Sequence, residues 1–120
     1  MARDTVDFLP HLFEHSQWAE DWFAIYNKRY FHGSLPPAYV GFYPRRKMGK
    51  SFAWTIRPDG FKYATHILLN PYFKTWPDVT KQNILHEMIH VKFRNRHGHG
   101  PRFKKEMRRL LLAGAFDDTL

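Results

Sequence analysis

The sequence contains no cysteine, and this absence excludes disulfide bonds, cysteine-ligated zinc ribbons and thiol catalysis. It also has no apolar run long enough to span a bilayer. Residues 1–13 lack the order of charge, apolar block and small residues that defines a signal peptide. We therefore expect a cytoplasmic protein that makes no contact with the membrane.

Acidic residues are scarce, with 11 Asp and Glu against 19 Lys and Arg, which gives a formal net charge of +8. The imbalance is greatest in residues 81–109, where nine Lys or Arg accompany only Glu87 and Glu106. A basic patch of this kind favours a polyanion such as nucleic acid. A solvated face that keeps a small protein soluble explains the composition equally well.

The chain is long enough for one domain with a single core, and no repeat or linker divides it. We expect an α+β fold over residues 1–120, with about three main helices packed on a small, about three-stranded sheet. Residues 1–15 are expected to form an arm or a short helix, because Pro10 interrupts any continuous one. Residues 115–120 are expected to fray.

The predicted helices have recognisable start and stop signals. Ser16 is a plausible N-cap for a helix that ends near Phe31, and Pro77 suits the first turn of a second helix that begins at residue 75 or 76. The last helix is expected over residues 101–113, capped by Gly100 and ended by Gly114. Its buried side is expected to consist of Phe103, Met107, Leu110 and Leu111. Strands are expected at 39–43, 51–56 and 65–69, with a basic loop at 44–50 and a turn at 58–60.

The stretch His86-Glu87-Met88-Ile89-His90 has the pattern H-E-x-x-H within the second of the main predicted helices. Residues 86 and 90 lie about 40° apart around such a helix and about 6 Å apart along it, so both imidazoles can reach one Zn²⁺. Glu87 projects beside them, where a general base must lie to take a proton from a water that the metal activates. A catalytic zinc needs a third protein ligand and leaves its fourth position to water.

The helical setting strengthens this interpretation. By chance the five-letter pattern would occur in such a chain in roughly one or two per cent of cases, so alone it is only a hypothesis. On a helical wheel, residues 79–94 form a wide apolar arc, and His86, Glu87 and His90 lie on the remaining polar arc. Polar residues on a helix that is buried on most sides need a role, which favours a metal site over histidines held in a core or at the surface.

The spacing after the motif limits the choice of the third ligand. The extended pattern H-E-x-x-H-x-x-G-x-x-H requires glycine at 93 and histidine at 96, but the chain has Phe93 and Arg96. A glutamate ligand from the following helix could only be Glu106, which could equally support a ligand. His97 and His99 remain, both in a glycine-containing turn.

The motif, followed by His99-Gly100-Pro101-Arg102-Phe103, resembles the SprT-like (Spartan) metalloprotease domain, whose pattern is HEMIH, a short variable spacer and HGPxF. Residues 26–36, 49–54 and 67–71 are similar to the family's first helix and its exit, its glycine-led strand, and the strand before its active-site helix. The similarity covers roughly residues 20–112.

This resemblance implies a small zincin-like metalloprotease fold and a zinc-dependent endopeptidase that holds one Zn²⁺. It assigns His86, His90 and His99 as the zinc ligands and Glu87 as the catalytic base, and it leaves His97 without a role. Eukaryotic members of the family cleave proteins covalently crosslinked to DNA and are stimulated by DNA. The expected partners are therefore a protein or peptide substrate and DNA, and the expected state is a monomer.

Basic residues in the loop and in the last helix are candidate contacts to nucleic acid, although a plain exposed turn explains the loop as well. These candidates are Arg45, Arg46, Lys47, Lys50, Arg102, Lys105, Arg108 and Arg109. Tyr63 and His66 are candidates for an additional oxyanion donor. Two other functions fit the sequence: a DNA-binding or adaptor module with a structural zinc site and little turnover, and a metal-dependent hydrolase of a non-protein substrate.

Overall fold

The computed structural model describes residues 9–57, 66–94 and 98–117, which form four α-helices and one four-stranded sheet. The α-helices are α1 (Gln17–Tyr30), α2 (Arg45–Met48), α3 (Pro77–Lys92) and α4 (Pro101–Leu112). The strands are β1 (Glu14–His15), β2 (Tyr39–Phe42), β3 (Ala53–Ile56) and β4 (His66–Leu69), and two 3₁₀ turns are η1 (Pro10–Leu12) and η2 (Pro71–Phe73). The predicted α+β class is confirmed. None of the described helices is both long and apolar enough to cross a membrane.

The sheet is mixed, with strand order β1-β2-β4-β3. β2 and β4 run parallel, whereas β1 and β3 are antiparallel to their neighbours. The prediction of three strands is wrong because β1 forms in the segment expected to be an arm. Two residues are too short to show an alternating pattern, so this strand depends on its pairing with β2. The pairing requires Gly41, since a Cβ there would collide with the carbonyl oxygen of Glu14.

Side chains of the central strands alternate between two apolar layers, as period-2 geometry requires. Ile67 and Leu69 point into the main core, which they share with buried residues of α1, α3 and α4. Leu68 and Ile56 point to the opposite face, where Met48 of α2 helps to cover them. Because both faces are covered, β3 and β4 are buried along their whole length.

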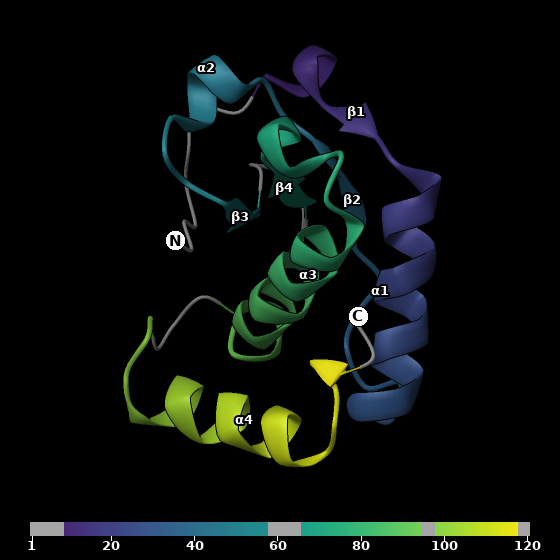
Figure 1. Ribbon diagram of the computed structural model, residues 1–120, viewed down its shortest axis with the longest axis vertical. Helices are drawn as coiled ribbons and strands as arrows, with labels where there is room; N and C mark the ends of the chain where they lie inside the picture. Colours follow the sequence, from purple (N-terminus) through teal and green to yellow (C-terminus); the bar gives the residue numbers. More distant parts are fainter. Residues whose placement is uncertain (1–8, 58–65, 95–97, 118–120) are drawn as a thin grey trace.

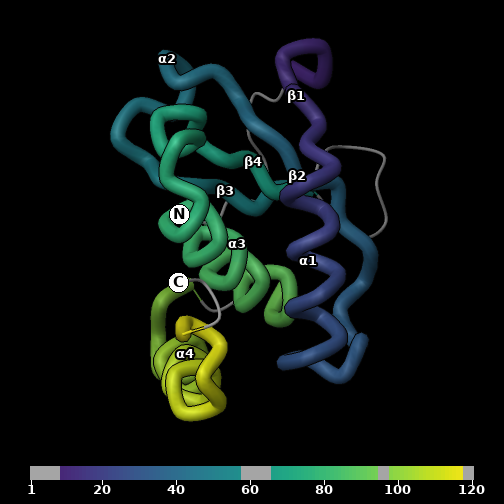
Figure 2. Tube along the Cα trace, turned by 45° about the vertical axis from the view of Figure 1, so that its right-hand side comes forward, coloured from purple at the N-terminus to yellow at the C-terminus, as the bar shows by residue number. Residues whose placement is uncertain are grey.

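The helices pack around α3, which lies across the sheet with α1 beside it (Figure 1). Ile84, Leu85, Met88 and Ile89 of α3 are fully buried, in agreement with the predicted apolar arc. α4 crosses the C-terminal end of α3, and Figures 1 and 2 show α4 and α2 at opposite ends of the molecule. The Ser16 hydroxyl caps α1 by accepting a hydrogen bond from the Ala19 N–H (3.1 Å), as its position predicts.

Two sequence predictions about local structure are wrong. The basic loop contains the short helix α2, because Met48 is buried and anchors one helical turn that Gly49, at φ +58°, ends. Leu111 is 57% exposed, while Met107 is only partly buried. The predicted turn at 58–60 lies outside the described residues.

The C-terminal residues that the structure describes also differ from expectation. Gly114, at φ +82°, turns the chain back toward the helix, and the Ala115 N–H donates to the Leu110 carbonyl (3.0 Å). Ala115 is fully buried, so the expectation that this segment frays is wrong for that residue.

Candidate metal centre

The side chains of three histidines converge at the junction of α3 and α4. His86 and His90 lie one turn apart on α3, with ring centroids 5.3 Å from each other. His99 precedes the N-cap of α4, and its Nε2 lies 3.2 Å from Nε2 of His86 and 3.1 Å from that of His90. Among the described residues, these three form the group of possible ligands whose donor atoms all lie within 4.8 Å of one another. They are close enough to hold one metal ion.

The arrangement fits the donor chemistry of a divalent metal such as zinc. Three nitrogens bound to one tetrahedral zinc at its usual bond length would lie about 3.3 Å apart, close to the separations from His99. Ligand imidazoles must also be neutral. Burial, with help from the neighbouring imidazoles, lowers the pKa of His86 to about 4 and that of His90 to about 3. Both rings therefore keep a free lone pair at neutral pH.

Phe103 of α4 supports the three imidazoles from one side. Its ring centroid lies 4.9 Å from those of His86 and His90, and 4.6 Å from that of His99. His90 is buried, whereas the side chain of His86 is 34% exposed and His99 is exposed. The histidine cluster thus has an apolar support and one side that is open to solvent.

Glu87 lies beside the cluster but does not belong to it. Its Oε2 is 3.9 Å from Nε2 of His86, and its Oε1 accepts a hydrogen bond of 2.9 Å from the Thr55 hydroxyl of β3. The residue is only 2% exposed, and burial raises the pKa of its carboxyl to about 7, although the Thr55 hydrogen bond acts in the opposite direction. A carboxyl with such a pKa is suited to exchanging a proton near neutral pH.

A model of the SprT-like family matches residues 19–117, the stretch from the first turn of α1 to beyond α4. The chain belongs to the SprT-like family. The resemblance drawn from the sequence is thus confirmed. Comparisons with curated proteins and with solved structures gave no match.

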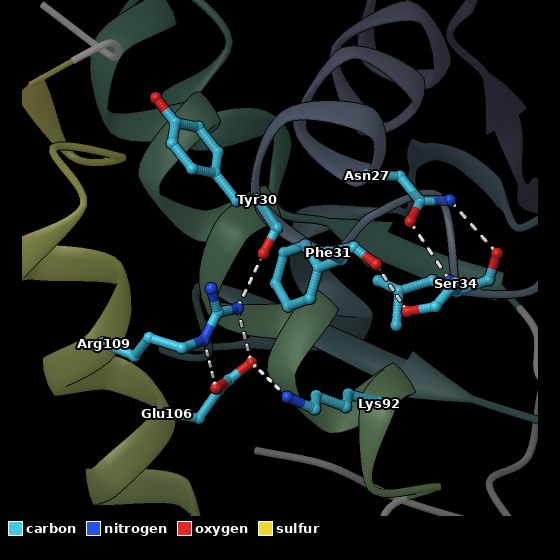
Figure 3. A network of polar contacts seen from close by, with 8 residues as sticks. Asn27, Tyr30, Phe31, Ser34, Lys92, Glu106 and Arg109 are labelled. Atoms are coloured by element: carbon cyan, nitrogen blue, oxygen red, sulfur yellow. Dashed lines mark hydrogen bonds and ion pairs between the residues drawn. The ribbon is translucent and has the colours of Figure 1, made fainter.

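A buried carboxylate anchors α4 in this SprT-like domain, as Figure 3 shows. Glu106 accepts hydrogen bonds from Lys92 (2.7 Å) and from Arg109 (2.7 and 2.8 Å), and Arg109 also donates to the Tyr30 carbonyl (2.7 Å). Burial alone would raise the pKa of Glu106, but these two cations lower it below the ordinary value. The contacts join α4 to α3 and to the end of α1, and they hold in place the helix that follows His99.

This network involves two residues that the sequence analysis named as candidates. Glu106 is paired with its cations and is not part of the described group of possible ligands, which favours a histidine over a glutamate as the third ligand. Arg109 was predicted to contact nucleic acid, but its guanidinium is tied to Glu106 and Tyr30.

The remaining candidate residues of the SprT-like domain are distributed over the whole molecule. His66 shares the sheet face of Leu68 and packs against the rings of Phe13 and Tyr39 (centroids 5.4 and 5.1 Å). It therefore lies on the face of the sheet away from α3, the helix that carries His86 and His90. Tyr63 and His97 lie outside the described residues. The basic candidates form two exposed groups near opposite ends: Arg45, Arg46, Lys47 and Lys50 in and after α2, and Arg102, Lys105 and Arg108 on α4.

The sequence analysis did not identify Thr55, which is separated from Glu87 by 32 positions along the chain. Thr55 is fully buried and is the polar residue in a strand whose other members are Ala53, Trp54 and Ile56. A hydroxyl at a buried strand position needs a hydrogen-bond partner. That requirement is the signal that could have identified Thr55 as a residue with a polar partner on a neighbouring element.

The raised pKa of Glu87 predicts a pH-dependent effect of Glu87→Gln on the metal-free SprT-like domain. Between its ordinary value of 4.5 and about 7, the folded state keeps a proton that the unfolded state releases. The contribution of Glu87 to folding stability is thus present below pH 4.5 and is lost as the pH rises toward 7. Glutamine does not titrate. As the pH rises across this range, the free energy of unfolding of the variant should therefore increase by up to about 3 kcal/mol relative to that of the wild type.

Urea unfolding in the presence of a chelator measures this difference, at about pH 5 and about pH 8. Asp78→Asn, which alters an exposed carboxyl in the first turn of the same helix, is the control and should show no comparable trend. An equal stability difference for Glu87→Gln at both pH values would contradict the prediction.

Proposed function

We propose that this SprT-like protein is a zinc-dependent endopeptidase. The observation that carries the proposal is the convergence of the Nε2 atoms of His86, His90 and His99 beside the buried carboxyl of Glu87. Membership of the SprT-like family supports a metallopeptidase-like domain. Three nitrogen ligands with an open fourth position are typical of catalytic zinc, whereas structural zinc sites usually have four protein ligands.

In this proposal His86, His90 and His99 hold one Zn²⁺. When bound, zinc supplies Lewis-acid activation of the attacking water and of the scissile carbonyl. Glu87 accepts the proton of that water at its carboxylate and passes it to the leaving amine. The Thr55 hydroxyl holds Oε1 of Glu87 and fixes the orientation of the carboxyl group. The substrate approaches from the exposed side of the cluster, past His86 and His99.

The proposed substrates are proteins bound or crosslinked to DNA. The net charge of +8 and the two exposed basic groups support attraction to a polyanion. A DNA-binding or adaptor module with a structural zinc site is the rival function. The solvent-exposed His99 and the neighbouring proton acceptor favour turnover over that role. A hydrolase of a non-protein substrate would share the same centre and differ only in what it cleaves.

Metal analysis combined with a cleavage assay tests the proposal. The purified protein should contain about one zinc per chain and should cleave a DNA-binding protein, more rapidly when DNA is present. A chelator should abolish the cleavage because it removes the metal, and added Zn²⁺ should restore it. Full zinc occupancy without cleavage of any protein, with or without DNA, would favour the rival functions.

A further inference from the structure

Four aromatic residues form a continuous cluster at the surface next to α2. Phe52 contacts Phe73 (ring centroids 4.6 Å apart), Phe73 contacts Tyr72 (5.0 Å), and Tyr72 contacts Trp76 (5.4 Å). We call Phe52, Tyr72, Phe73 and Trp76 the aromatic platform. The guanidinium carbon of Arg45 lies 4.4 Å from the centre of the Tyr72 ring, so a cation of α2 is stacked on the platform.

The platform is unusual because its rings are exposed. Phe52, Tyr72 and Trp76 are 55%, 46% and 48% exposed, and only two other aromatic residues in the described part of the chain are comparably accessible. None of the four platform residues belongs to either apolar core. Single exposed apolar residues are common, but a contiguous exposed cluster usually marks a binding surface. The proposed peptidase chemistry makes no use of it.

The charges around the platform indicate the kind of partner. Arg45, Arg46, Lys47 and Lys50 are exposed beside it, while Lys74 of the same surface is paired with Glu14 (2.8 Å). The acidic neighbour in the first turn of α3 is Asp78, so cations predominate. Aromatic rings bind unpaired bases by stacking, and lysine or arginine side chains beside them bind the phosphates of the same strand. In a duplex the base faces are already stacked and are not available to the rings.

We propose that the aromatic platform and the basic residues of α2 bind single-stranded nucleic acid. The platform ends at Trp76, and the histidines of α3 follow ten and fourteen residues later, which corresponds to on the order of 15–20 Å along the helix. A strand bound there leaves the histidine cluster uncovered. If the strand carries an attached protein, its binding here would bring that protein to the metal centre, and this step rests on the proposed function. The binding of the strand itself does not.

Fluorescence anisotropy with a labelled oligothymidylate of about 15 nucleotides and a duplex of equal length tests the proposal on the zinc-loaded full chain. The single strand should bind more tightly than the duplex. Trp76→Ala and Tyr72→Leu should each weaken this binding about five- to tenfold, whereas Tyr72→Phe should retain it because the ring remains. Trp18→Ala is the matched control, since Trp18 is 41% exposed on α1 and outside the platform, and it should have no effect.

The basic residues are tested by the dependence of the same affinity on salt. Arg46→Gln with Lys47→Gln should weaken binding. It should also make the slope of log K against log[salt] less negative by about one to two, because each lost phosphate contact contributes roughly −0.7 to that slope. Arg102→Gln with Lys105→Gln on α4 removes the same charge elsewhere and should change the affinity less. Thermal unfolding of every variant verifies that it is folded.

Three results would overturn the proposal: tighter binding of the duplex, equal effects of the Trp76 and Trp18 variants, or a loss of binding only with the α4 variant. Absence of binding to the single-stranded oligonucleotide would also overturn it, and binding to anionic lipid vesicles instead would indicate a membrane surface. None of these measurements depends on proteolysis, so failure of the peptidase proposal and failure of this one are distinguishable.

Discussion

Glu87→Gln is expected to abolish proteolysis while zinc binding and the fold are retained. Glutamine has the shape of glutamate and can still accept the Thr55 hydrogen bond, but it cannot take a proton from the attacking water. Loss of a general base lowers a rate by about a hundredfold to ten-thousandfold. The initial rate of cleavage of a DNA-binding protein, measured beside the zinc content of the same preparation, gives the comparison.

Asp78→Asn is again the control for this experiment, because Asp78 is an exposed carboxyl at the start of the same helix, remote from the histidine cluster. Its cleavage rate should equal that of the wild type. Unchanged proteolysis in Glu87→Gln would remove Glu87 from the mechanism. Loss of zinc in that variant would mean instead that the carboxyl supports the ligands.

The local features of this site were predictable because they follow from helical geometry. Two histidines four residues apart must share one face of α3, and a glycine before a proline marks the start of α4. The structure indeed brings His86, His90 and His99 together, while their role as metal ligands stays a prediction.

Contacts between distant segments were not predictable in the same way. The hydrogen bond from Thr55 to Glu87 depends on the packing of β3 against α3, and no pattern along the chain encodes it. For Glu106, the sequence suggested a metal-ligand role, whereas the structure shows a different set of contacts. A carboxylate near a metal motif suggests a ligand, but its buried position is explained by Lys92 and Arg109.

The same distinction applies to the fold. α1 and α4 begin at residues 17 and 101, directly after the predicted caps Ser16 and Gly100, because caps act within one turn. α3 begins at Pro77, one or two residues after the start predicted at residue 75 or 76. β1 and α2 escaped prediction because a two-residue strand and a four-residue helix have no periodicity, and each is stabilised by tertiary contacts. Such contacts are made by Gly41 of β2, which pairs with His15 of β1, and by buried Met48 in α2.

His99→Ala is expected to reduce zinc affinity by more than about a hundredfold, because even residues that only support a ligand change affinity ten- to hundredfold. Its ring is the one that closes the cluster, since its Nε2 lies within 3.2 Å of those of both α3 histidines. Competition with a chromogenic chelator measures the affinity. The rise in unfolding temperature that zinc gives the wild type should also disappear, because a ligand stabilises the fold only as far as it binds.

His97→Ala is the decisive comparison, because the sequence alone left both histidines as possible third ligands. This variant should keep the affinity and the zinc-dependent rise in unfolding temperature. The opposite pattern, with zinc binding lost in His97→Ala and retained in His99→Ala, would show that the convergence of three imidazoles does not define the ligand set. Loss of zinc in both variants would mean that the turn before α4 contributes more than one ligand, and that no open position remains for water.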